Sequence, residues 1–244
     1  MLKFIQMEFF KLKNSKMFLL TLLGSLAPAL LVYLGFVGRL DFGEPINYAL
    51  LSGQTHLYML GVFGVFLTTV IVSYMFSREY SEHTLKSIFT APVSRSKYLV
   101  GKSVSFLIWI LILCSVCFIT STILCIVTGV DGLTLNLFLK HFSEMLIGGC
   151  LLFLVMTPLM FIAMLMRSMV PAMIVAAILS FGNIIAYGHE EAIVYPWILP
   201  TMLSSGEITS LTSNLTIPYV VVLITFVVGL VLSYVYLTQK DVRL

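Results

Sequence analysis

The sequence predicts an all-α polytopic membrane protein with six transmembrane helices, and three observations lead to this fold class. Of the 244 residues, 59% are apolar and only 10% are charged, whereas a typical soluble domain carries about 25% charged residues. The mean hydropathy is +1.05. The apolar residues form long continuous runs and not alternating ten-residue strands, which favours helices over a transmembrane barrel.

Six apolar runs are long enough to cross the hydrocarbon core, which takes about 20 helical residues. Pro28 and Pro158 lie inside the first and fourth runs, where a proline is expected to kink the helix. The predicted spans are residues 17–38, 57–76, 104–128, 142–166, 169–188 and 218–238.

Lysine and arginine are divided unequally between the two sides of this arrangement. Twelve of the fourteen lie in the N-terminal segment, the segment 77–103, the turn at Arg167 and the C-terminal tail, whereas Arg39 and Lys140 lie on the other side. Seven of the eleven acidic residues lie with those two. The positive-inside rule therefore predicts a plasma-membrane protein with cytoplasmic N- and C-termini, and the charge pattern gives no indication of nucleic-acid binding.

The N-terminal segment 2–16 is basic and amphipathic. Its apolar residues recur at helical spacing, and its lysines lie off that line. This pattern is typical of a helix in the headgroup layer of the inner leaflet, and the alternative is a plain positively charged anchor for the first span. The apolar line consists of Leu2, Ile5, Phe9 and Leu12.

The segment 77–97 predicts a short helix between the second and third spans. Glu82 and Lys86 form an i, i+4 pair, and Pro92 ends the helix. A solvated loop would not need the small apolar face that this helix carries. The alternative is an amphipathic helix that simply lies on the membrane. The face consists of Leu85, Ile88 and Phe89.

The segment 189–216, before the last span, is apolar but interrupted by two prolines, so it is too short to cross the membrane. It predicts an outer re-entrant hairpin with Tyr195 and Trp197 in the headgroup zone. A loop packed on the outer helix ends is the alternative. His189 stands before two glutamates and is a weak candidate for a metal or proton site, because no second histidine lies near it in the sequence.

The segment after the second span resembles the cytoplasmic loop of ABC-2 type transporter permeases. That family carries an E-Y-x-x-x-T-x-K stretch followed by P-[VI]-S-R and a later lysine, and this chain has the corresponding residues between positions 78 and 102. The N-terminal helix, the six spans and the interrupted outer segment also fit the family. The chain is similar to small bacterial permeases that export peptide antibiotics, of the bacitracin and lantibiotic-immunity types, or toxin peptides. The matching residues are Arg78, Glu79, Tyr80, Thr84, Leu85, Lys86, the run 91–95 and Lys102.

The resemblance implies a division of labour between this chain and a separate ATPase. The sequence has no G-x-x-x-x-G-K-[ST] phosphate loop, so the chain would be a non-catalytic subunit without a cofactor, and ATP and Mg²⁺ would bind to the partner. Two ATPase copies and a second permease, identical or a paralogue, would complete the exporter. The resemblance implies that the ATPase-coupling helix contains Glu79, Tyr80, Glu82, Thr84, Leu85, Ile88, Phe89, Pro92 and Arg95.

A second set of candidate residues is a methionine stripe on the fourth and fifth spans. Methionine is flexible and accepts varied apolar partners, so the stripe is a candidate path for an amphiphilic peptide or hydrophobic drug. Ordinary helix packing or lipid contact is the alternative. The stripe consists of Met156, Met160, Met164, Met169 and Met173.

Two other function classes remain open from the sequence. An ion-coupled secondary carrier normally needs charged groups deep in the membrane, and the predicted spans contain almost none. A membrane-embedded enzyme needs a nucleophile or metal set, and no such motif is recognisable. The C-x-x-C of Cys114 and Cys117 lies in an apolar span, where cysteines usually act as small buried hydrophobes.

Overall fold

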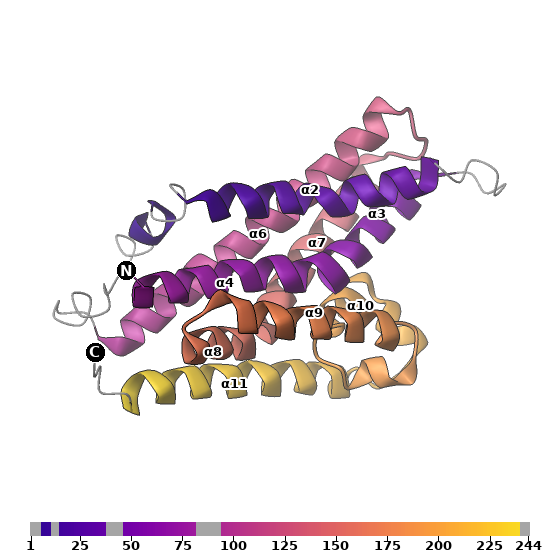
Figure 1. Ribbon diagram of the computed structural model, residues 1–244. Helices are drawn as coiled ribbons and strands as arrows, with labels where there is room; N and C mark the ends of the chain where they lie inside the picture. The colour runs from indigo at the N-terminus through magenta and orange to yellow at the C-terminus, as the bar shows by residue number, and fades with distance from the viewer. Residues whose placement is uncertain (1–5, 11–14, 38–45, 82–93, 240–244) are drawn as a thin grey trace.

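The computed structural model describes residues 6–10, 15–37, 46–81 and 94–239, which are almost entirely helical. The long helices of this described part lie side by side in one bundle, and no β-strand occurs among them (Figure 1). Within the same residues, six helices are long and apolar enough to cross a membrane, which confirms the predicted fold class. They are α2 (Lys16–Val37), the continuous helix α3–η1–α4 (residues 48–81), α6 (Arg95–Val127), α7 (Leu135–Val155), α9 (Met169–Ala186) and α11 (Thr216–Gln239).

The second transmembrane helix is the most buried of the six and forms the centre of the bundle. It consists of α3 (Tyr48–Tyr58), one π-helical turn η1 (Met59–Phe63) and α4 (Gly64–Ser81). The helices α2, α6, α9 and the short α8 (Thr157–Met166) pack around α4. A displacement of α4 would therefore also displace the four helices that pack against it.

The π-helical turn interrupts the regular backbone ladder, and α9 supplies hydrogen-bond donors to it. Asn183 Nδ2 donates to the Gly61 carbonyl at 2.5 Å, and Ser180 Oγ donates to the Val62 carbonyl at 3.1 Å. A carbonyl released by a π turn inside a membrane protein needs such a partner, because no water is present in hydrocarbon. These two bonds fix the register of α9 against the central helix.

Two helices extend beyond the predicted spans 57–76 and 104–128. Asn47 caps α3 and Ser94 caps α6, each with a side-chain oxygen that accepts a hydrogen bond from a first-turn backbone N–H. The apolar windows mark only the part of a helix that suits hydrocarbon. Further turns continue the second helix at both ends and the third helix at its start only, since α6 ends at Val127.

The predicted fourth span, 142–166, is divided between α7 and α8. The break falls just before Pro158, whose missing N–H cannot continue the ladder of α7. Thr157 Oγ1 lies there and donates to the Phe226 carbonyl of α11 at 3.2 Å. Gly229 allows this contact, because a Cβ at that position would lie 2.5 Å from the Pro158 nitrogen.

The two ends of the bundle carry different charges. One end holds the start of α2, the end of α4, the start of α6 and the end of α11, and we call it the basic end. Its described basic residues are Lys16, Arg78, Arg95, Lys97, Lys102 and Arg167. The opposite end, which we call the acidic end, carries Asp131, Glu144, Glu190, Glu191 and Glu207. Assignment of the basic end to the cytoplasm stays a prediction.

The outer segment 189–216 folds into three short helices at the acidic end. They are η2 (Glu190–Ile193), α10 (Leu199–Ser205) and η3 (Glu207–Ser210). The apolar side of α10 is buried, and the helix packs mainly against α7. Ser204 lies beside Gly148 in the middle of α7, and Ile198 and Thr201 lie beside Gly61 of η1. The re-entrant hairpin and the loop packed on helix ends both stay predictions.

Candidate functional site

A buried ion cluster lies at the basic end, where three segments of the chain meet. Lys102 of α6 is 1% exposed. Its Nζ lies 3.0 Å from Glu79 Oε1 of α4 and 3.3 Å from Glu8 Oε2 of the short helix 6–10. The same Nζ donates to the Met75 carbonyl at 2.6 Å. The lysine therefore joins α6, α4 and the N-terminal helix at one point.

Two aromatic rings lie against the ammonium group of Lys102 in this cluster. Lys102 Nζ lies 5.0 Å from the ring centroid of Phe76 and 5.4 Å from that of Tyr98, within the range of cation–π attraction. The Tyr98 hydroxyl donates a hydrogen bond to Glu79 Oε2. We call the set of Glu8, Phe76, Glu79, Tyr98 and Lys102 the Glu79–Lys102 cluster.

The local sequence explains why these groups meet. Glu79 lies near the end of α4, and Tyr98 and Lys102 lie one turn apart near the start of α6, on the face that α6 turns toward α4. A charge buried in this way is stable only when paired and hydrogen-bonded, so each member requires the others. Glu79 and Lys102 are also the acidic and basic ends of the motif 78–102.

Arg95 attaches the last helix to the same end. Its Nη1 donates to the Leu237 carbonyl at 2.5 Å and to the Thr238 carbonyl at 2.7 Å. These carbonyls belong to the last turn of α11, where a helix leaves acceptors without intrahelical donors and carries partial negative charge. The start of α6 is thus held to both α4 and the end of α11.

These contacts change the interpretation of two predicted coupling residues. Glu79 was expected to face an ATPase, but its side chain is 3% exposed and points into the chain, so we remove it from the docking surface. Arg95 is directed at α11. Tyr80 lies in the last turn of α4, with its side chain outside the described residues. Six further candidates also fall outside them, namely Glu82, Thr84, Leu85, Ile88, Phe89 and Pro92.

The methionines of the proposed path divide into two groups. Met156, Met160 and Met164 are at most 1% exposed and belong to the main core, and Ser103 Oγ contacts the Met160 sulfur at 3.9 Å. Met169 and Met173 of α9 are half-buried. The first three therefore act as packing residues in this conformation, which favours the packing alternative for them.

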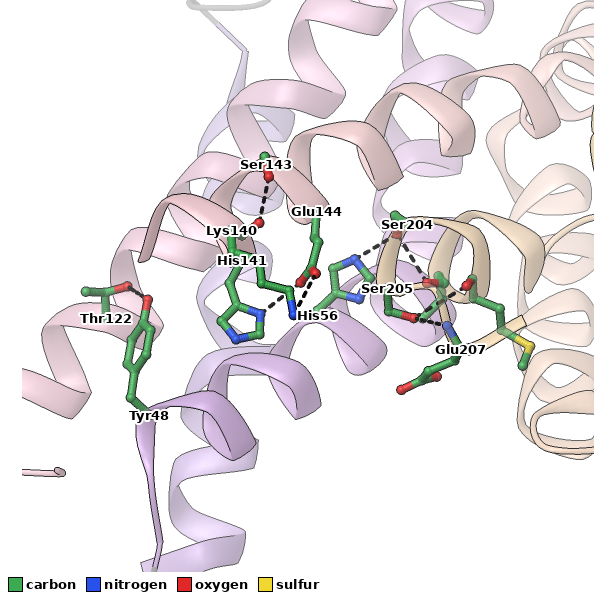
Figure 2. Close-up of polar contacts among 12 residues, drawn as sticks. Tyr48, His56, Thr122, Lys140, His141, Ser143, Glu144, Ser204, Ser205 and Glu207 are labelled. Carbon is green, nitrogen blue, oxygen red and sulfur yellow. Dashed lines mark hydrogen bonds and ion pairs between the residues drawn. The ribbon is translucent and has the colours of Figure 1, made fainter. Parts of the chain in front are cut away.

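Sequence reasoning missed a polar group at the acidic end, drawn in Figure 2. His56 Nε2 lies 2.9 Å from Ser204 Oγ of α10, and the Glu144 carboxylate of α7 contacts His141 at 2.8 Å and Lys140 at 3.8 Å. The available signal for His56 was its position directly before the predicted span 57–76. Among the described residues, no group of three or more His, Cys, Asp or Glu side chains could hold a metal ion.

These acidic-end contacts connect elements. His56 joins α3 to α10, and the Tyr48 hydroxyl lies 3.3 Å from Thr122 Oγ1 and so joins α3 to α6 (Figure 2). Tyr187, just after α9, donates to Glu207 at 2.9 Å. Burial, followed by the hydrogen bond to this carboxylate, raises the pKa of Tyr187 to about 12. These contacts stabilise the packing of the segment 189–216 against the bundle.

Comparison with known proteins identifies the family. The family model described as "ABC-2 family transporter protein" matches residues 4–183. The chain is also 33% identical over 199 residues to the bacitracin transport permease protein BCRB of Bacillus licheniformis, which covers 82% of this chain and 95% of that protein. The family match includes every residue of the Glu79–Lys102 cluster. Together with the six membrane-spanning helices, the two matches show that the chain belongs to the ABC-2 family of transporter proteins.

Proposed function

We propose that this chain is the membrane-spanning subunit of an ATP-driven exporter, and that a separate ATPase docks at the basic end on the segment 77–97. Family membership supports a transporter permease, and the sequence contains no phosphate loop for ATP. ATP and Mg²⁺ would bind to the partner. The basic end would face the cytoplasm of a bacterium, with the plasma membrane around the bundle.

The Glu79–Lys102 cluster is the observation that carries this proposal. The cluster lies near the end of α4 at Ser81 and the start of α6 at Arg95. The docking segment connects these two helix ends in the sequence. Because the buried charges hold those two helix ends together, a force that the ATPase applies to the docking segment would move α4 and α6 as one unit. Since α4 is part of the central helix, the displacement reaches α2, α8 and α9 directly.

The assembly would contain two ATPase copies and a second permease, either identical or a paralogue. Each permease would then receive force from one ATPase through its own docking segment. The candidates left for direct docking are Tyr80, Glu82, Thr84, Leu85, Ile88, Phe89 and Pro92.

An amphiphilic peptide or hydrophobic drug is the proposed substrate. The relative named as a bacitracin transport permease supports a peptide antibiotic. The charged side chains in the described spans lie toward the two ends, and the middle is apolar. This distribution suits an amphiphile better than a hydrophilic solute, which needs convergent polar groups. It also counts against a proton-coupled carrier with a charged relay across the membrane.

The proposal is tested by expressing the chain with its cognate ATPase in a sensitive host and measuring inhibitory concentrations for a panel of peptide antibiotics. We expect protection that requires both subunits and is lost when the phosphate-loop lysine of the ATPase is replaced. Leu85→Asp with Phe89→Asp should abolish copurification of the ATPase while the permease still inserts. A permease that protects cells without any ATPase would contradict the proposal.

A further inference from the structure

An apolar groove of about 470 Å³ lies between α6 and α11 on the basic-end half of the bundle. One wall is the stretch 99–107 of α6, and the other is the stretch 226–234 of α11. Phe153 of α7 forms the floor, with its ring centroid 6.2 Å from that of Phe226. Ser103 and Tyr234 are also in the lining, but the groove surface itself consists of apolar atoms, which favours an apolar occupant.

The geometry of the two helices explains why the groove exists. Arg95 holds α6 against the last turn of α11 at the basic end. Below that contact, Phe153 is inserted between the two helices and contacts the rings of both Phe106 and Phe226. The helices therefore meet at their ends and are separated along the intervening two turns.

We propose that this groove binds the acyl chain of an anionic phospholipid from the leaflet at the basic end. The walls run along about 12 Å of helix, because each spans nine residues and therefore eight rises of about 1.5 Å. One leaflet contributes about 15 Å of the hydrocarbon core. The groove thus begins about one turn below the helix ends and reaches toward the bilayer midplane, which is the depth and direction of an acyl chain.

The charge at the mouth of the groove selects the headgroup. Arg95 and the exposed Lys97 lie in the first turn of α6, directly above Leu99 and on either side of the groove wall. Basic side chains at headgroup depth attract anionic lipids. A phosphatidylglycerol with its chain in the groove would place its phosphate beside these two residues.

A helix from a second copy of the chain fits less well. A helix is a rigid cylinder about 10 Å in diameter, and it cannot change its shape to match the groove. A flexible hydrocarbon chain can fill the narrow space without a void, and voids are unfavourable in a packed protein.

Native mass spectrometry of the full chain in detergent tests this inference, with phosphatidylglycerol and phosphatidylcholine of identical acyl chains as probes. We expect the protein to retain phosphatidylglycerol more strongly. Leu230→Trp fills the groove and should weaken retention about tenfold, since two lost methylene contacts already account for that factor. The matched control is Leu232→Trp, because Leu232 lies on the same helix, is 41% exposed and does not line the groove.

A second set of variants tests the role of the basic charge at the mouth of the groove. Lys97→Gln should reduce retention of phosphatidylglycerol and leave that of phosphatidylcholine unchanged, whereas Lys140→Gln at the acidic end should change neither. Val104→Phe, from the opposite wall, provides a second groove-filling variant should Leu230→Trp fold poorly. Equal retention of the two lipids, or unchanged retention in both groove-filling variants, would overturn the inference. A dimer mass that becomes monomeric in Leu230→Trp alone would assign the groove to a second copy and would overturn it as well.

Discussion

Lys102 is a charged residue that the fold holds almost completely away from water, and its substitution is the most direct test of the Glu79–Lys102 cluster. Lys102→Met keeps the side-chain length but removes the ammonium group that Glu8 and Glu79 both contact. Removing one partner of a buried ion pair costs about 3–5 kcal/mol. We therefore expect a large decrease in Tm, measured by thermal unfolding in detergent, and loss of transport.

A matched control is available at the other end of the bundle. The side chain of Lys140 is 65% exposed and lies 3.8 Å from Glu144, which also contacts His141 at 2.8 Å, and a pair whose cation lies in solvent contributes about 0–1 kcal/mol. Lys140→Met should therefore leave the Tm nearly unchanged. If Lys102→Met were equally harmless, the cluster would not hold the three segments together.

The double variant separates an internal role of Glu79 from a docking role. If Glu79 acts through Lys102, the loss in the pair Glu79→Gln with Lys102→Met should be smaller than the sum of the two single losses, because the second change removes an already uncompensated charge. Additive losses would mean that Glu79 acts independently of Lys102, as a docking residue would.

The sequence identified Glu79 and Lys102 as candidate functional residues, but it did not show which residues they contact. Glu79 and Lys102 were recognised through the motif 78–102, and the motif suggested a surface for a partner. Glu8 carried no signal, because nothing local relates it to residues more than seventy positions away. Contacts of that kind follow from how helices pack, and helical periodicity defines only which residues share a face.

At the scale of elements, the contact between α8 and α11 depends on the absence of a side chain at Gly229. A Cβ there would lie 2.5 Å from backbone atoms of Thr157 and Pro158, and backbone cannot move aside as a flexible side chain can. Overpacking of this kind typically costs about 1–3 kcal/mol. We expect Gly229→Ala to lower the Tm and to reduce the amount of folded protein in size-exclusion chromatography.

Gly53 provides the comparison for this substitution. It lies in α3, and an added Cβ would meet nothing within 4 Å. Replacing a helical glycine by alanine normally stabilises by about 0.5–1 kcal/mol, so Gly53→Ala should keep or slightly raise the Tm. Equal effects of the two substitutions would mean that chain entropy, and not the close approach of α11, decides the outcome.

The element boundaries show where sequence reasoning stops for a membrane protein. Hydropathy located all six membrane-spanning helices, because hydrocarbon admits few polar side chains. It did not locate their ends, since caps such as Asn47 and Ser94 lie in polar sequence that resembles a loop. The division at Pro158 was anticipated as a kink, because proline removes a backbone donor wherever it stands.

For the molecule as a whole, the open question is which end faces the cytoplasm. We predict that Ser94→Cys reacts with impermeant thiol reagents only after the cells are opened, and that Ser210→Cys reacts from outside. Both positions are exposed, and they lie at the basic and acidic ends respectively. The measurement is gel-shift labelling with a maleimide reagent in intact and permeabilised cells.

A cysteine-free background makes this labelling interpretable. Of the four native cysteines, Cys114, Cys117 and Cys125 are buried, and Cys150 is exposed within α7. Labelling of Ser94→Cys from outside would reverse the orientation and would also place the proposed docking segment beyond the reach of any cytoplasmic ATPase.

The Glu79–Lys102 cluster also bears on how the protein is made. A chain is synthesised from its N-terminus, so Glu8 and Glu79 leave the ribosome before Lys102 does. Until the third membrane-spanning helix enters the bilayer, both carboxylates must remain in the headgroup layer. The arrival of Lys102 is then the step at which the N-terminal helix and the end of α4 become fixed. A biogenesis intermediate that ends just after the second helix would thus be inserted but not yet assembled, and the membrane quality-control machinery would encounter it with two acidic groups still in the headgroup layer.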